Sequence, residues 1–161
     1  MTGDLRLVPY DGSGAREVVA WCAASPYSRE WVPAGATDPD AVLGGWHTDP
    51  DITGHLLLRG DLPVAYGELW VEEVEDEAEL AHLVVDPAQR RQGLGRALAT
   101  ALVAVARAVP VSNLFLRVHP DNDAAIACYA TAGFVPVSAE DEVAFNAGQR
   151  ASYRWMRHEP S

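Results

Sequence analysis

The chain of 161 residues carries 23 acidic and 12 basic side chains, for a net charge of −11, and 48% of its residues are hydrophobic. This length and composition predict a single globular domain over residues 1–161 and exclude a disordered or fibrous protein. The acidic balance argues against a nucleic-acid partner, whose phosphates need a basic surface, and favours a cationic one.

Neither a membrane span nor a secretory signal is visible in the sequence. The longest apolar stretch, ALATALVAVARAV, is short and contains arginine, and the N-terminus lacks a basic segment followed by an apolar block. Cys22 and Cys128, the only two cysteines, fit ordinary buried thiols in a reducing compartment. Since His and Cys are not spaced as ligands, we expect no metal. The cysteines, the hydropathy and the charge together predict a cytoplasmic protein without a membrane or nucleic-acid partner.

The first part of the chain predicts one strand, two helices and three further strands. Residues 5–10 alternate as a strand does, and residues 14–25 place apolar side chains on one helical face. A proline-containing loop over 26–40 leads into a short helix over 39–48, which two glycines weaken. Strand-like runs separated by turn residues follow at 54–60, 62–73 and 77–86.

The second part of the chain predicts alternating helices and strands. Residues 94–108 form an amphipathic helix, and residues 122–133 form a helix that begins at an Asn122 N-cap and ends at Gly133. Strands are expected at 113–119, 134–138 and 151–158. This order predicts an α/β (α+β mixed) fold with a central, mixed, mostly antiparallel sheet flanked by about four helices.

The segment DPAQRRQGLGRAL, residues 86–98, has an unusual composition for an acidic protein. The first amides of a helix lack partners within the helix, and Gly93 and Gly95 keep side chains away so that an anion can reach them. Arg90, Arg91 and Arg96 add positive charge at the same place. The segment therefore predicts a phosphate-binding corner, although the lysine of a Walker loop and the third glycine of the dinucleotide fingerprint are both missing.

Two motifs resemble those of the GCN5-related N-acetyltransferases, the GNAT family. Residues 90–95, which follow the strand ending HLVVDP, resemble the family's (Q/R)xxGx(G/A) motif. The later run NDAAIACYATAGF resembles its second signature, at Asn122, Ala125, Tyr129, Gly133 and Phe134. The resemblance covers about residues 62–136 and implies the GNAT-type fold for the chain.

The resemblance implies acetyl-coenzyme A as cosubstrate, with its pyrophosphate on the main-chain amides between Arg91 and Arg96. In the family, the preceding strand carries a bulge and diverges from its neighbour, so that the pantetheine arm pairs with the exposed main chain. The implied cofactor-binding residues are Leu83, Val84, Val85, Arg90, Arg91, Gln92, Gly93, Leu94, Gly95, Arg96, Asn122, Ala125 and Tyr129.

The same resemblance gives Tyr129 a catalytic role, in which the phenol donates a proton or a hydrogen bond to the leaving thiolate. A phenol with a pKa of about 10 is a weaker acid than a thiol with a pKa of about 8.5, so complete transfer is uphill by about 2 kcal/mol. We therefore favour stabilisation of the developing thiolate charge over complete proton transfer.

The acceptor amine needs a base, since an alkyl amine with a pKa of about 10.4 is nearly all ammonium at neutral pH. Glu79, on the strand beside the acetyl position, is the first candidate, and Glu68, Glu72 and His119 are its rivals. Strand alternation places His82 on the opposite face from Glu79 and argues against it. A carboxylate that some relatives carry near position 117 is absent here, because this chain has Arg117.

The predicted function is transfer of an acetyl group from acetyl-CoA to a primary amine, of a small molecule or a peptide, by direct attack in a ternary complex. A protein N-terminal acetyltransferase and a non-catalytic acyl-CoA-binding sensor are the alternatives, and a homodimer is the expected assembly. Four aromatic residues in the first part of the chain either line the acceptor site or pack in the core: Trp21, Tyr27, Trp31 and Trp46.

Overall fold

The computed structural model describes residues 4–159, so both ends of the predicted domain, 1–3 and 160–161, lie outside the described residues. The elements are β1 (Leu5–Pro9), α1 (Ala15–Ala23), α2 (Pro39–Trp46), β2 (Ile52–Arg59), β3 (Leu62–Glu72), β4 (Glu77–Val85), α3 (Leu94–Arg107), β5 (Asn113–Val118), α4 (Asp123–Thr131), β6 (Phe134–Pro136), α5 (Ala139–Asn146) and β7 (Arg154–His158). Short 3-10 turns occupy Arg29–Trp31, Glu73–Glu75 and Pro87–Gln89. In the part of the chain described, no helix is long and apolar enough to cross a membrane.

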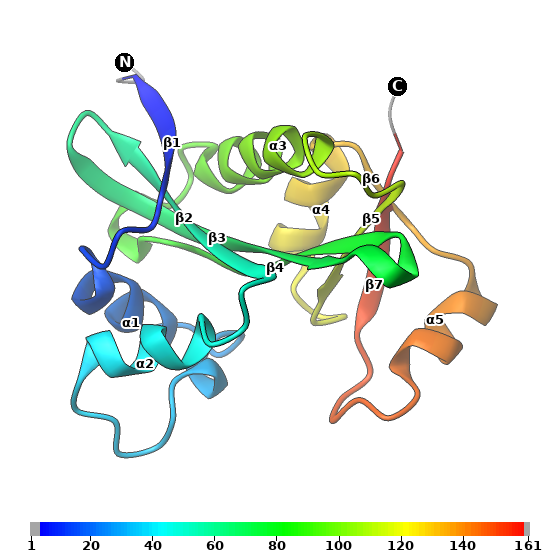
Figure 1. The fold of residues 1–161 in the computed structure, drawn as a ribbon, viewed down its shortest axis with the longest axis horizontal. Coiled ribbons are helices and arrows are strands. Elements are labelled where there is room, and N and C mark those ends of the chain that lie inside the picture. Colours follow the sequence, from blue (N-terminus) through cyan, green and yellow to red (C-terminus); the bar gives the residue numbers. More distant parts are fainter. Residues whose placement is uncertain (1–3, 160–161) are drawn as a thin grey trace.

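The seven strands form one sheet in the order β1-β2-β3-β4-β5-β7-β6. β4 and β5 run parallel, and the other neighbouring pairs are antiparallel. The helix α3 makes the crossover between the parallel strands, and it lies with α4 on one face of the sheet, whereas α1, α2 and α5 lie on the other (Figure 1). The predicted mixed, mostly antiparallel sheet is confirmed.

One helix was not predicted. The N-cap of α5 is Ser138, whose hydroxyl accepts a hydrogen bond from the amide of Asp141 at 3.1 Å, and the first turn is acidic. Its sequence, AEDEVAFN, carries no apolar stripe from which a helix could be expected, and accordingly the helix buries no residue completely.

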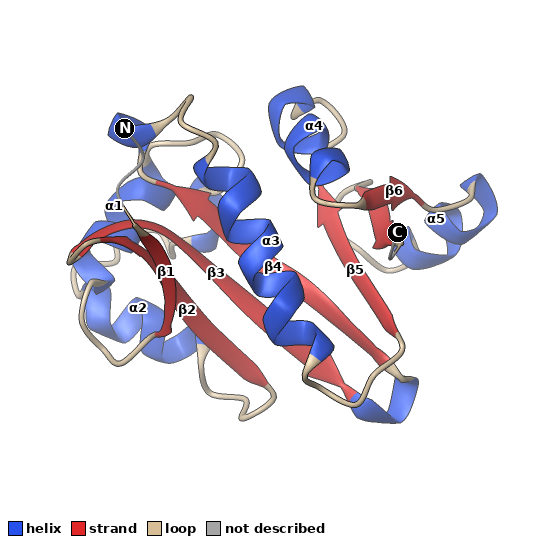
Figure 2. Cartoon of the chain, turned by 90° about the horizontal axis from the view of Figure 1, so that it is seen from above, coloured by secondary structure: helices blue, strands red, loops and turns tan. Residues whose placement is uncertain are grey.

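Each face of the sheet has its own core. On the α3 face, leucines of the helix pack on buried residues of β3, β4 and β5, and Figure 2 shows α3 crossing over β3 and β4. Gly67 of β3 allows this approach, because a Cβ there would lie 2.7 Å from Cδ1 of Leu102. On the other face, Trp21, Leu43 and Tyr66 belong to the core under α1 and α2.

The end of β4 is irregular on both of its edges. On the β3 side, Glu68 pairs with Ala81 and Tyr66 pairs with Val84, so Gly67 alone faces two residues of β4, as in a β-bulge. On the β5 side, the pairing ends at Leu80 with Leu116, five residues before β4 does. The two parallel strands therefore diverge beyond Leu80, as the family resemblance implies.

Candidate active site

The phosphate-binding corner predicted from the sequence lies at the start of α3. Gly93 is the N-cap with a φ of 73°, and Arg91 also has a positive φ, of 66°. The first helical hydrogen bond joins the amide of Ala97 to the carbonyl of Gly93, which leaves the amides of the preceding turn without a helical acceptor. The side chain of Leu94 is buried in the core, so this residue has only its main chain to offer a ligand.

The charge at this corner is not neutralised by the protein. Arg90, Arg91 and Arg96 are exposed, and none of them forms a salt bridge with a carboxylate of residues 4–159. Gln92 differs, because its side chain donates to Gln89 at 3.3 Å within the loop. Three unpaired cations around free amides give the corner the electrostatics of an anion site.

Gly95 has a packing role that the sequence did not predict. The expectation was that both glycines keep the amides accessible, and Gly93 does have open space around it. A Cβ at Gly95, however, would lie 2.9 Å from Sγ of Cys128, so this glycine permits close packing of α3 against α4.

The main chain of Leu83, Val84 and Val85 faces the opening between β4 and β5. Val84 and Val85 pair with β3 on one edge, and no strand pairs with them on the other edge within the described sheet. The α4 helix borders the same region: Asn122 caps it by accepting from the amide of Ala125 at 3.3 Å. Ala125 and Tyr129 are half-buried against the core.

Tyr129 stays a neutral phenol. Burial, and to a smaller extent the neighbouring Cys128, raise the pKa of Tyr129 above its ordinary value. Its ring meets Phe134 edge-on, with the ring centroids 6.5 Å apart. A neutral hydroxyl at this place is suited to donate a hydrogen bond and unsuited to act as a base.

Glu68 is a fully buried carboxylate with several donors. Its Oε2 accepts from the Tyr66 hydroxyl at 2.6 Å, and its Oε1 accepts from Nε1 of Trp70 at 2.8 Å and lies 2.9 Å from Nδ1 of His82. Burial alone would raise the pKa of Glu68, but the hydrogen bonds and charge from His82, with those of Tyr66 and Trp70, outweigh it and hold the pKa below its usual range. The carboxylate is therefore ionised inside the protein.

The network continues to His47. Its Nε2 lies 2.7 Å from the Tyr66 hydroxyl, and because that hydroxyl donates to Glu68, Nε2 of His47 is the donor in this contact. Gly54 makes room for these groups, since a Cβ there would lie 2.7 Å from the Tyr66 oxygen. The sequence analysis missed Tyr66 and Trp70, although Tyr66, Glu68 and Trp70 alternate along β3 and so share one face.

The predicted orientation of His82 was wrong. Simple alternation along β4 would turn its ring away from the Glu79 side, but the bulge gives His82 a φ of 50° and places its Nδ1 beside Glu68. The imidazole lies between two indole rings, with centroid distances of 4.7 Å to Trp31 and 4.6 Å to Trp46. The ring of Trp70 is nearly perpendicular to the imidazole, with the two centroids 5.5 Å apart.

Glu79, the first candidate base, forms a two-point salt bridge with Arg117. Nε and Nη2 of the guanidinium donate to the two carboxylate oxygens at 2.8 and 3.2 Å, and Nη1 donates to Gln149 at 2.8 Å. Burial raises the pKa of Glu79, and the pairing with Arg117 offsets only part of this. Both oxygens of Glu79 are thus occupied by one cation.

A cavity of about 410 Å³ adjoins this salt bridge on the α1, α2 and α5 side of the sheet. Arg117 lies over the rings of Trp70, Tyr153 and Trp155, at 5.0 to 5.8 Å from their centroids. The lining residues are Trp70, Glu72, Glu77, Ala78, Glu79, Phe115, Arg117, Phe145, Gln149 and Trp155. Since Nε1 of Trp70 donates to Glu68, the cavity and the Glu68 network share one wall.

The remaining candidate residues lie in three different places. Trp21 is buried in the core, whereas Trp31 and Trp46 contact His82. His119 lies 5.5 Å from the ring of Tyr27 and 3.5 Å from a carboxylate oxygen of Glu30. The structure therefore does not bring His119 into the Glu68 network.

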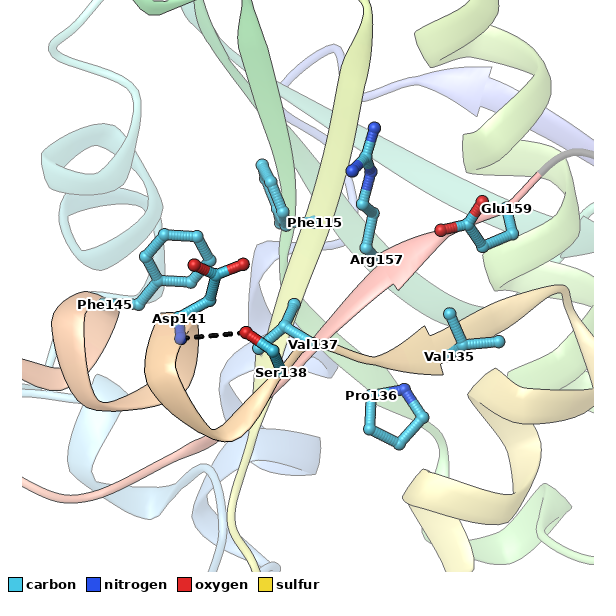
Figure 3. Close-up of a pocket in the computed structure, with 9 residues that line it drawn as sticks. All are labelled: Phe115, Val135, Pro136, Val137, Ser138, Asp141, Phe145, Arg157 and Glu159. Carbon is cyan, nitrogen blue, oxygen red and sulfur yellow. Dashed lines mark hydrogen bonds between the residues drawn. The ribbon is translucent and has the colours of Figure 1, made fainter.

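A second, smaller cavity of about 190 Å³ lies under β6, β7 and the start of α5 (Figure 3). Phe115 and Phe145 reach it as well as the larger cavity, but it contains none of the candidate site residues. No group of three or more His, Cys, Asp or Glu side chains that could hold a metal occurs in residues 4–159.

A sequence model described as the acetyltransferase (GNAT) family matches residues 15–134. The [ribosomal protein bS18]-alanine N-acetyltransferase of Escherichia coli K12 is 48% identical over 61 residues, which are 38% of this chain and 41% of that protein. The chain thus aligns with about two fifths of the length of the curated relatives it matches.

Solved structures resemble the chain over nearly its whole length. A spermidine N-acetyltransferase SpeG chimera from Vibrio cholerae and hSSAT superimposes with a TM-score of 0.75 at 18% identity, covering 96% of this chain and 94% of that one. The aminoglycoside acetyltransferase AAC(6')-Ib in complex with coenzyme A and kanamycin gives a TM-score of 0.71 at 19% identity, covering 96% and 94%. At these identities the likeness establishes the fold.

Proposed function

Because the chain belongs to the GNAT acetyltransferase family, we propose that it transfers an acetyl group from acetyl-coenzyme A to an amine. The observation that carries this proposal is the divergence of β4 from β5 beside the free amides at the start of α3. An extended chain with a diphosphate at one end fits such a place, since the strand edge offers main-chain partners and the helix end offers an anion site.

In this proposal, the amides between Arg91 and Arg96 hold the pyrophosphate, and the three arginines add charge. The main chain of Leu83, Val84 and Val85 pairs with the pantetheine arm, and Asn122, Ala125 and Tyr129 of the α4 region line its other side. The thioester then lies near the bulge, between the two faces of the sheet.

The acceptor enters from the face that carries the cavity of about 410 Å³. Three carboxylates line this cavity, Glu72, Glu77 and Glu79, and Arg117 pairs with the last of them. The other two carboxylates leave the cavity acidic, and the whole chain has a charge of −11. Both features favour a cationic amine. In the reaction, the amine nitrogen attacks the thioester carbon, the C–S bond breaks, and the Tyr129 hydroxyl donates a hydrogen bond to the leaving sulfur.

Two acceptor classes have support from the comparisons. The curated relatives act on an alanine of a ribosomal protein by name, which favours the amino terminus of a protein, whereas the SpeG chimera and AAC(6')-Ib are named for spermidine and aminoglycosides. The carboxylates in the cavity favour an acceptor with more than one positive charge, and a basic peptide satisfies this as well as a polyamine.

The test measures release of free coenzyme A from acetyl-CoA in the presence of an amine panel. The panel includes short peptides with free amino termini, polyamines, aminoglycosides and simple monoamines. We expect turnover with a multiply charged member above that with any monoamine. Tight binding of acetyl-CoA without turnover on any acceptor would instead support a non-catalytic acyl-CoA sensor.

A further inference from the structure

Assuming the proposed acetyl transfer, we infer that His82 is the general base of this protein and that the buried Glu68 is the residue that positions it. Three features of the molecule support this assignment: the bulge in β4, the Glu68 network and the three tryptophans around the imidazole.

The bulge places His82 at the reaction site. His82 directly precedes Leu83, the first residue of the strand edge that we assign to the pantetheine arm. Glu79 lies three residues earlier, within the part of β4 that is still paired with β5, and about 10 Å farther along the strand. A base must reach the attacking amine directly or through one water, so the position favours His82.

The surroundings fix both the position and the tautomer of the imidazole. Nδ1 of His82 is buried without a well-aligned hydrogen bond, and an oxygen of the Glu68 carboxylate lies 2.9 Å from it. An ionised carboxylate there retains the proton on Nδ1, which leaves the lone pair on Nε2. The side chain of His82 is 18% exposed, so the ring is not sealed from solvent.

Charged and aromatic groups surround the ring. Glu68 has no exposed surface, and the rings of Trp31 and Trp46 are tilted by 42° and 44° to the imidazole. The titratable groups of the described residues near His82 are Glu68 and Glu79, with His47 reaching Glu68 at 3.5 Å.

The proton balance of the step is complete. An incoming ammonium gives one proton to Nε2 of His82, and the resulting amine forms a C–N bond to the thioester carbon. As the C–S bond breaks, the second proton lost by the nitrogen ends on the sulfur, assisted by the hydrogen bond from Tyr129. The imidazolium then releases its proton to solvent, so the net reaction converts ammonium and acetyl-CoA into amide, coenzyme A and one proton.

The closing experiment replaces His82 by asparagine and by glycine. Both residues accept a positive φ more readily than most others, so the bulge is retained in each variant. We expect kcat/KM to fall at least 100-fold in His82→Asn, with the Kd of coenzyme A within twofold of wild type. In His82→Gly, added imidazole should restore part of the rate, which a purely structural role would not allow.

The pH profile separates His82 from its rivals. The acid limb of kcat/KM should disappear in His82→Asn and persist in Glu79→Gln and His119→Asn. In Glu68→Gln, kcat/KM should fall while the Kd of coenzyme A stays within twofold of wild type, because the ring loses the carboxylate that positions it. The assignment is overturned if His82→Asn retains its rate within twofold, if imidazole gives no rescue, or if the limb disappears in Glu79→Gln or His119→Asn instead.

A measurement without turnover tests the inference independently of the proposed function. Nitrogen-15 NMR of the neutral His82 ring, assigned by comparison with His82→Asn, should show the proton on Nδ1. A proton on Nε2 would overturn the assignment. If the wild-type protein binds acetyl-CoA but acetylates no amine, the proposed function fails, and the tautomer still decides whether His82 is set to accept a proton.

Discussion

The two sides of the opening beside β4 are built from different materials. The proposed cofactor side includes main-chain amides and exposed arginines within seven consecutive residues, Arg90–Arg96. The proposed acceptor side consists of side chains from β3, β4, the turn at Trp31 and the end of α2, which are far apart in sequence and meet around a buried carboxylate. The first therefore depends on local backbone conformation, whereas the second depends on tertiary packing.

The two sides depend on the identity of their side chains to different degrees. An amide can hold a phosphate whatever side chain it carries, provided that the backbone has the right conformation and nothing blocks it. A buried carboxylate, by contrast, depends on each donor around it, because removing one leaves a buried polar group without a partner. Substitutions on the two sides should accordingly affect different quantities.

The largest expected effect is that of Gly93→Glu on the cofactor side. A carboxylate at the N-cap repels a diphosphate and brings a side chain into space that is now open. We expect coenzyme A affinity to fall at least 100-fold by calorimetry, or about 2.7 kcal/mol. Gly93→Asn is the matched control, since asparagine accepts the φ of 73° without adding charge. Unchanged affinity in Gly93→Glu would contradict the phosphate corner.

Tyr129→Phe should separate catalysis from binding at the boundary between the two sides. Loss of the hydroxyl removes a donor to the leaving sulfur but preserves the packing against Phe134. We expect kcat to fall about 10- to 100-fold with the Kd of coenzyme A nearly unchanged. Equal turnover in steady-state assays would remove Tyr129 from the mechanism.

Glu68→Gln should affect stability as well as rate. The amide cannot accept from all the donors that meet the carboxylate, so we expect a loss of about 2 kcal/mol in unfolding free energy at pH 7. Because the folded pKa of Glu68 is lowered, its contribution to stability is complete above the unfolded value of about 4.3 and is lost as the pH falls below it. The unfolding free energy, measured by urea titration from pH 7 to pH 3, should therefore fall less steeply with pH in Glu68→Gln than in wild type. Parallel plots of this free energy against pH would show that Glu68 is not ionised.

The smallest effect is expected for Gly95→Ala. The added methyl group meets Sγ of Cys128, so we predict a loss of about 1 kcal/mol in stability with little change in coenzyme A affinity. In Gly95→Ala combined with Cys128→Ala, most of the lost stability should return, because the sulfur is gone. If the double variant stays as unstable as the single one, the contact between α3 and α4 is not the reason for the glycine.

The sequence was informative where the structure depends on neighbouring residues. The cap at Asn122, the turn at Gly133 and the start of α3 follow from residue types at fixed offsets, and the structure has all three. It failed at His82, because the direction of that side chain depends on a bulge opposite Gly67, and strand alternation contains no sign of it. The purpose of Gly95 was likewise hidden, since Cys128 approaches it only through tertiary packing.

Within residues 4–159, only four paired positions, from Glu77–Asn113 to Leu80–Leu116, join the strands β1–β4 to the strands β5–β7. The sheet thus consists of two parts that are joined along one end of β4 and β5 and separated by the opening at the other end. A pantetheine arm bound in the opening would contact both parts and hold them together. We therefore expect amide hydrogen exchange to slow on β5 and β7, beyond the direct contacts, when coenzyme A is added.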